Sequence, residues 1–279
     1  MPAILHVPTA PQRTGVLLVV GGPQTRVGSH RQFVLLARDL ATASIPVMRF
    51  DYRGMGDADG ESRTFESVDD DIGAAIDVFV KQVPGLERVV LWGLCDAASA
   101  ASFYAARDSR IAGLVLLNPW VRTEAGQARA FLTRYYLSRL VDPALWKKVF
   151  RGEFRPGQSI KELAGNVKKA SGAGETKTKT DPEPMASMSS TCLPPLPERM
   201  LAGLQAFNGP ILFILSGDDL TAEEFRNTAK SSRAWKKLLR QTRVQRHDLP
   251  DANHTFSRRV WRDQVAVWTR NWIQGLSER

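Results

Sequence analysis

Residues 93–97 read GLCDA, and they are the part of this chain that decides its fold. They follow a short apolar run, RVVLW at 88–92, and lead into an alanine-rich stretch at 97–106. An apolar strand, a tight turn and a helix in this order predict a nucleophile elbow, in which the turn holds a reactive side chain above the end of a sheet. Small residues two before and two after the nucleophile make room for the turn, and this chain has glycine and alanine there. The pattern makes Cys95 the candidate nucleophile.

The centre and the end of this pentapeptide depart from the usual elbow motif. Serine normally occupies the central position and glycine the last one, whereas this chain has Cys95 and Ala97. A lone pentapeptide is equally compatible with a buried structural cysteine that follows a core strand. The role of Cys95 therefore depends on partners elsewhere in the sequence.

Two later segments supply such partners. An apolar strand is predicted at 210–215 and ends in SGDD at 216–219, and a last strand at 244–249 ends in PDANHTF at 250–256. The chain order nucleophile, acid, histidine, with each group at the C-terminal end of a predicted strand, belongs to the α/β-hydrolase fold and differs from the order in other triads. Three matches in this order favour a catalytic triad over a structural cysteine.

The triad gives each group one role. Cys95 would attack an acyl carbon, and His254 would accept the thiol proton and return it to the leaving group. A carboxylate would orient the imidazole and stabilise its charged form. Asp219 is the favoured carboxylate because LTA at 220–222 follows it, which resembles the usual turn into a helix, and Asp218 is the alternative.

Acyl transfer also needs backbone donors for the oxyanion of the tetrahedral intermediate. One donor is the N–H of the residue after the nucleophile, Asp96, and the other comes from the loop GGPQ at 21–24, which follows an apolar strand. Pro23 has no N–H, so Gln24 is the expected second donor and Gly22 is the alternative. The Asp96 carboxylate suits a helix N-terminus. If it points at the site instead, it opposes thiolate formation and repels anionic substrates.

A glycine-rich loop and the other histidines receive supporting roles. The loop DYRGMGD at 51–57 resembles the Asp-x-Arg-Gly-x-Gly-x-Ser loop of α/β-hydrolases, with Asp57 in place of the serine, and is expected to brace the loops beside the elbow. No Lys-Ser or Lys-Thr pair follows it, so a phosphate-binding role is not expected. Packing or capping is expected for His6, His30 and His247, although His30 follows the glycine-rich loop after the first apolar strand and could face the site.

Strand and helix patterns alternate along most of the chain. The first part alternates predicted strands at 15–20, 46–50, 88–92 and 111–117 with predicted helices at 29–42, 68–80 and 97–106. This alternation predicts a mostly parallel, doubly wound sheet with helices on both of its faces. Residues 1–120 and 197–279 are assigned to this α/β core.

The alternation stops between the two parts of the core. Residues 121–196 are assigned to a helical cap insertion over the site. Within it, residues 165–196 are rich in Gly, Ser, Thr, Lys and Pro and contain few large apolar side chains, a composition typical of a mobile or disordered segment. Cys192 lies in this segment and is expected to have no role in the reaction.

Composition and charge exclude some classes of function. The chain has 279 residues, 43% of them hydrophobic, and a formal net charge of +9. The basic residues at 230–246 and 258–270 have the spacing of solvated helix faces, without the interleaved aromatics of a nucleic-acid surface, so no nucleic-acid partner is expected.

No apolar run is long enough to span a bilayer, and no signal peptide is recognised at the N-terminus. Two cysteines do not make a disulfide framework, so a reduced, cytoplasmic protein is expected.

The motifs together resemble the α/β-hydrolase superfamily, and more narrowly the first of the two hydrolase families associated with exosortase A systems. The narrower resemblance is carried by GGPQ at 21–24, VGSHRQF at 27–33, WGLCDAASA at 92–100 and SGDDLTA at 216–222. It implies a Gram-negative bacterium that makes exopolysaccharide and sorts proteins with a C-terminal anchor signal. The elbow is also similar to that of dienelactone hydrolases, which implies ester or lactone chemistry, although this chain lacks their glycine two residues after the cysteine.

The sequence therefore predicts a cap-bearing hydrolase that acts on small-molecule esters or thioesters through an acyl-thioester intermediate. Amides are disfavoured because a thiolate leaves the tetrahedral intermediate more readily than an unprotonated amine does. Neither a metal nor an organic cofactor is implied, and the oligomeric state is left open. An acyltransferase on the same fold and a non-catalytic module of the polysaccharide or sorting machinery are the alternatives.

Overall fold

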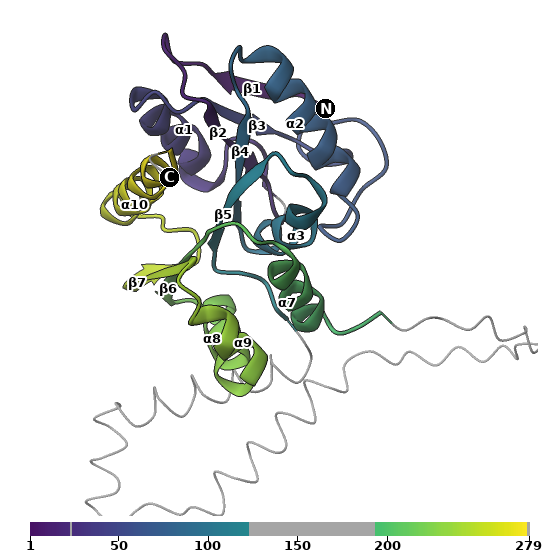
Figure 1. Ribbon diagram of the computed structural model, residues 1–279, viewed down its shortest axis with the longest axis vertical. Helices are drawn as coiled ribbons and strands as arrows, with labels where there is room; N and C mark the ends of the chain where they lie inside the picture. The colour runs from purple at the N-terminus through teal and green to yellow at the C-terminus, as the bar shows by residue number, and fades with distance from the viewer. Residues whose placement is uncertain (23, 123–192, 278–279) are drawn as a thin grey trace, which may run out of the picture. The chain divides into compact units, whose positions relative to one another are not determined.

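A seven-stranded sheet forms the centre of the computed structural model, which describes residues 1–22, 24–122 and 193–277 (Figure 1). Its strands lie in the order β1-β3-β2-β4-β5-β6-β7. β1 pairs antiparallel with β3, and every other neighbouring pair is parallel. The strand bounds are β1 Ala3–His6, β2 Thr14–Val19, β3 Val47–Phe50, β4 Arg88–Leu94, β5 Ile111–Leu117, β6 Ile211–Asp218 and β7 Val244–Asn253. The expected mostly parallel sheet is confirmed.

Helices cover both faces of this sheet, as the alternation predicts. α1 and α10 lie together on one face, and α2, α3 and α7 lie on the other (Figure 1). α8 and α9 connect β6 to β7, and α9 contacts α7. The helices are η1 Ser29–Arg31, α1 Gln32–Thr42, α2 Asp69–Gln82, α3 Asp96–Tyr104, η2 Ala105–Arg107, α7 Leu196–Ala206, α8 Leu220–Ser231, α9 Arg233–Leu239 and α10 Arg259–Ser277.

The central strands are buried on both faces, which explains why they read as continuous apolar runs. All six residues of β2 are buried, as are the first six residues of β6. Burial ends at the last two residues of β6, where the strand reaches the carboxyl edge of the sheet. In a parallel sheet all carboxyl ends meet at one edge, so the predicted nucleophile, acid and histidine are carried to the same edge.

Some element bounds differ from the sequence prediction for local reasons. The helix expected at 29–42 begins as a short 3₁₀ turn, because His30 and Arg31 have φ of 53° and 58° and cannot continue an α-helix. β6 and β7 run further than their apolar stretches and include Asp218 and Asn253. Among the described helices, none combines the length and apolarity needed to cross a membrane.

The cap prediction lies mainly outside the described residues. Of the segment 121–196, only residues 121–122 and 193–196 are described, and the segment 165–192 with Cys192 is not. The cap therefore stays a prediction.

The glycine-rich loop after β3 is bonded to Arg26, in the segment after β2, and to α2. The Asp51 carboxylate is fully buried and accepts hydrogen bonds from the Arg26 N–H at 2.5 Å and the Asp57 N–H at 3.2 Å, besides an ion pair with the Arg26 guanidinium. Gly56 has a φ of 57°, and a methyl group added there would lie 2.4 Å from an Asp51 oxygen. Arg53 pairs with Asp71 of α2 at 2.6 Å. These contacts fix the loop against the segment of Arg26 and against α2.

Candidate active site

Cys95 occupies a strained turn between β4 and α3. Its φ of 64° and ψ of −126° are rare for a residue other than glycine, and such strain costs on the order of 1–3 kcal/mol. Both of its backbone groups are tied to the end of β5 and the segment that follows: the Cys95 N–H donates to the Leu117 carbonyl at 2.9 Å, and its carbonyl accepts from the Trp120 N–H at 3.2 Å. The neighbouring strand end thus holds the turn in place, as a nucleophile elbow requires.

Close approach of β4 and α3 explains the small residues on either side of Cys95. A methyl group added at Gly93 would lie 2.6 Å from the carbonyl carbon and oxygen of Ala97. Ala97 itself is fully buried. A larger side chain at either position would push the helix away from the strand.

We expect Gly93→Ala to lower the free energy of unfolding by about 1–3 kcal/mol, because the new methyl group meets backbone atoms that cannot turn aside. Gly275→Ala in α10 is the matched control, since a methyl group there has nothing within 4 Å. Urea unfolding followed by circular dichroism measures both variants. Equal midpoints for the two variants would show that the elbow is not sterically tight.

His254 joins Cys95 to a buried carboxylate. Its Nδ1 lies 2.9 Å from Asp219 Oδ2. Burial of the ring lowers the pKa of His254, but the interactions with Asp219 and with Cys95 outweigh this effect and raise the pKa to about 10. Asp219 and Cys95 thus both favour the imidazolium form of His254.

Asp219 is held by the start of α8. Its two carboxylate oxygens accept hydrogen bonds from the N–H groups of Thr221 and Ala222, both at 3.1 Å, so it is also the N-cap of that helix. Asp218 lies at the end of β6 with an exposed side chain. The structure thus places Asp219, and not Asp218, against His254.

Two asparagines that no sequence motif singles out support the histidine loop. Asn118 is fully buried; its Nδ2 donates to the His254 carbonyl at 2.9 Å, and its Oδ1 accepts from the Ser216 N–H at 2.8 Å. Asn253 accepts from the Ser257 N–H at 3.0 Å and donates to its hydroxyl at 2.8 Å. The only local signal for Asn118 was its place after β5, before a proline.

The predicted oxyanion donors are arranged around the Asp96 carboxylate. The Gly22 N–H donates to Asp96 Oδ2 at 2.8 Å, and the Ala97 N–H donates to Oδ1 at 2.9 Å. Gln24 lies beyond them, where its side-chain Oε1 accepts from the Ser29 N–H at 3.4 Å. Burial raises the pKa of Asp96, while the backbone donors and the charge of His254 oppose that rise. Position 23, a proline, is outside the described residues.

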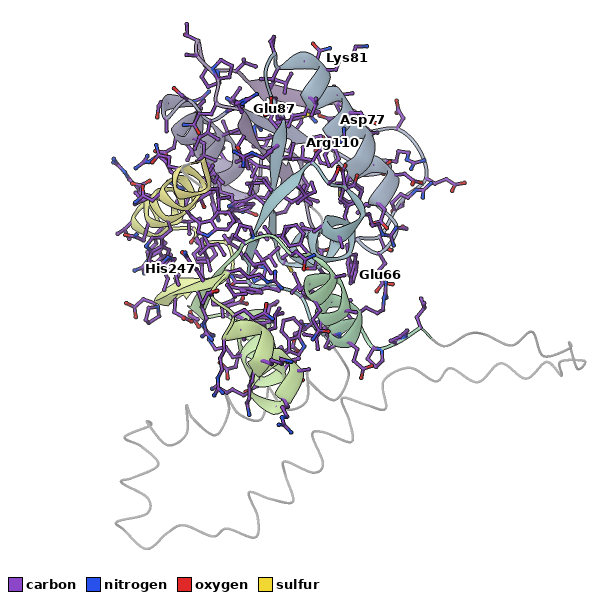
Figure 2. All side chains as sticks on the ribbon, viewed as in Figure 1. Glu66, Asp77, Lys81, Glu87, Arg110 and His247 are labelled. Atoms are coloured by element: carbon purple, nitrogen blue, oxygen red, sulfur yellow. The ribbon has the colours of Figure 1, made fainter. Side chains whose placement is uncertain are left out.

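His6 and His247 lie in packing environments, as expected. His6 on β1 contacts Arg49 at 3.2 Å, and its pKa is lowered by burial and by that guanidinium. His247 lies on β7 at one edge of the sheet (Figure 2), where it stacks on Trp268 with the ring centroids 4.4 Å apart. His30 lies in the 3₁₀ turn before α1. Among the described residues, no three His, Cys, Asp or Glu side chains are grouped to hold a metal ion.

Comparison with known proteins agrees with this geometry. The family model described as "Alpha/beta hydrolase family" matches residues 16–266. None of the curated proteins matches significantly.

Several solved structures share the fold. The esterase Pf2001 of Pyrococcus furiosus matches with a TM-score of 0.60 at 16% identity, over 96% of this chain and 84% of that one. Est1E of Butyrivibrio proteoclasticus, solved with ferulic acid bound, matches with 0.59 at 14% identity, over 100% and 96% of the two chains. A monoacylglycerol lipase of Paleococcus ferrophilus matches with 0.57 at 17% identity, over 100% and 99%. At these identities the likeness establishes the fold alone.

Proposed function

This chain belongs to the α/β-hydrolase family, and from that premise we propose that it hydrolyses esters or thioesters with Cys95 as its nucleophile. The observation that carries the proposal is a cysteine in a strained turn that interacts with His254, whose Nδ1 lies 2.9 Å from Asp219 Oδ2. A buried structural cysteine needs neither a histidine partner nor a strained turn. A role in presenting the sulfur to a substrate explains why the protein tolerates the backbone strain of that turn.

The proposed reaction has two halves that share His254. In the first half His254 accepts the proton of the Cys95 thiol, and Asp219 stabilises the imidazolium that forms. The sulfur attacks the acyl carbon, the carbonyl oxygen becomes an oxyanion, and the bond to the leaving oxygen or sulfur breaks as His254 Nε2 gives that atom its proton. Water then attacks the thioester, losing its proton to His254, and the carboxylic acid leaves with Cys95 restored.

An acyltransferase would use the same residues with a different second substrate. An alcohol or sugar hydroxyl would replace water as the group that attacks the acyl-thioester. Hydrolysis and acyl transfer therefore differ only in whether water or the acceptor hydroxyl reaches the site. A non-catalytic module is disfavoured, since it has no need of a histidine and a buried carboxylate beside a strained cysteine. The resemblance of residues 21–33 and 92–100 to the exosortase-associated hydrolases links the proposed activity to exopolysaccharide or protein-sorting systems. A thiol nucleophile also suits the reducing cytoplasm.

Intact-protein mass spectrometry after exposure to a panel of activated esters and thioesters tests the proposal. We expect one acyl group to be added, with peptide mapping placing it on Cys95, and the preferred acyl group to identify the substrate class. A Cys192→Ser background removes the chain's other thiol. Failure of every ester to acylate a Cys95 that iodoacetamide does alkylate would overturn the proposal.

A further inference from the structure

The side chain after the nucleophile is held by backbone donors at the start of α3. The two oxygens of the Asp96 carboxylate accept hydrogen bonds from the N–H groups of Gly22 at 2.8 Å and Ala97 at 2.9 Å, and the N–H of Asp96 itself also stabilises its charge. Among the described ion pairs, none involves this carboxylate. Its charge is therefore balanced by peptide dipoles and by the nearby His254.

One of these donors is a candidate donor for the reaction. In this fold the oxyanion is bound by the N–H of the residue after the nucleophile and by an N–H of the loop after a neighbouring strand. Asp96 has the first position, and Gly22 and Gln24 are the candidates for the second. An oxyanion-hole donor lies about 2.7–3.1 Å from the oxyanion it binds, and Asp96 Oδ2 lies within that range of the Gly22 N–H. The carboxylate thus takes up a loop donor that could bind the oxyanion.

The loop after β2 is shaped to admit this carboxylate. A methyl group added at Gly21 would lie 2.1 Å from Asp96 Oδ1, so only glycine leaves the oxygen its place. The next donor position along the loop is removed, because Pro23 has no N–H. Gly22 and Gln24 are therefore the candidate donors of this loop, and Asp96 already uses Gly22.

We propose that Asp96 is an internal occupant of the oxyanion hole, and that acyl transfer at Cys95 begins only once a substrate displaces its carboxylate. The inference rests on the proposed function, because the hole matters only if a tetrahedral intermediate forms. It makes Asp96 a residue that determines specificity: simple esters, which displace the carboxylate poorly, acylate Cys95 slowly.

Comparing two reactions of the Cys95 sulfur distinguishes an effect of Asp96 on the oxyanion hole from an effect on the reactivity of the thiol. Alkylation by iodoacetamide forms a C–S bond with loss of iodide and develops no oxyanion, whereas acylation by p-nitrophenyl acetate passes through one. Both rates are measured by mass spectrometry on full-length Cys192→Ser protein carrying Asp96→Asn or Asp96→Ser. An amide presents one acceptor oxygen in place of two, and serine is too short to span both donors. Asp59→Asn, which changes an exposed carboxylate, controls for net charge.

We expect the ratio of the acylation rate to the alkylation rate to rise about tenfold or more in both Asp96 variants, given what one oxyanion donor contributes, and to stay unchanged in Asp59→Asn. A ratio that stays the same or falls in variants with a wild-type alkylation rate and thermal midpoint would overturn the inference and leave the proposed function standing. If no protein of the set is acylated although all are alkylated, the proposed function fails and the inference fails with it. Two variants of different size guard against one that does not fold.

Discussion

Replacing Cys95 with alanine should abolish acyl-adduct formation and the hydrolysis of model esters. No other nucleophile lies at the elbow, and loss of the nucleophile from such a triad costs on the order of 10⁶-fold in kcat. The fold should persist, because alanine removes one sulfur from a half-buried position without touching the backbone bonds to the end of β5 and the segment that follows. Steady-state hydrolysis of p-nitrophenyl esters and intact mass measure the loss.

Cys95→Ser is the matched control for this change, since it keeps the size of the side chain. An alcohol needs a stronger base than a thiol, so this variant should fold normally and retain only a small part of the activity. If Cys95→Ala hydrolyses model esters as fast as the wild type, the activity arises elsewhere and Cys95 is structural.

Local patterns predicted the sheet and its buried strands because both faces of a parallel sheet are covered. The continuous apolar runs of β2 and β6 directly reflect that burial. The tight turn at Cys95 was predictable for a similar reason, since close approach of β4 and α3 requires small residues at fixed spacing. These features depend on neighbours in the chain.

Contacts between distant segments left no such signal. The hydrogen bond from Asn118 to the His254 carbonyl joins residues 136 positions apart. No local pattern in either segment predicts that the two residues are in contact. The same holds for the Gly22 N–H and the Asp96 carboxylate, 74 positions apart. The sequence was compatible with Asp96 capping α3 or pointing at the site. In the structure its carboxylate accepts hydrogen bonds both from the Ala97 N–H in the first turn of α3 and from the Gly22 N–H in the loop after β2.

Two adjacent aspartates at the end of β6 could be told apart from the sequence that follows them. Asp218 is the last residue of the strand and its side chain is exposed, whereas Asp219 begins α8 and is buried. Both are aspartates, so only the residue at which the strand ends distinguishes them. The small residues after Asp219 indicated that helix start, which explains why it was the favoured acid.

Asp219→Asn should slow ester hydrolysis far more than Asp218→Asn does. The amide cannot stabilise the His254 imidazolium and can favour the wrong tautomer, a change that costs about 10⁴-fold in kcat where the nucleophile is a serine. A thiol needs less help from its base, so we expect a smaller loss here and predict the order of the two variants.

The stability of the two variants must be compared alongside their rates, because Asp219 has two structural roles. It caps α8 through the Thr221 and Ala222 N–H groups, and an asparagine keeps part of that cap, so a loss of about 1 kcal/mol of unfolding free energy or less is expected from this source. Denaturant titration and steady-state kinetics on the same preparations separate folding from catalysis. A fall in kcat for Asp219→Asn at an unchanged KM, with the protein still folded, would place the carboxylate in the chemical step. If Asp218→Asn is the more damaging change, the strand ends one residue earlier in solution, and Asp218 is the acid that orients His254.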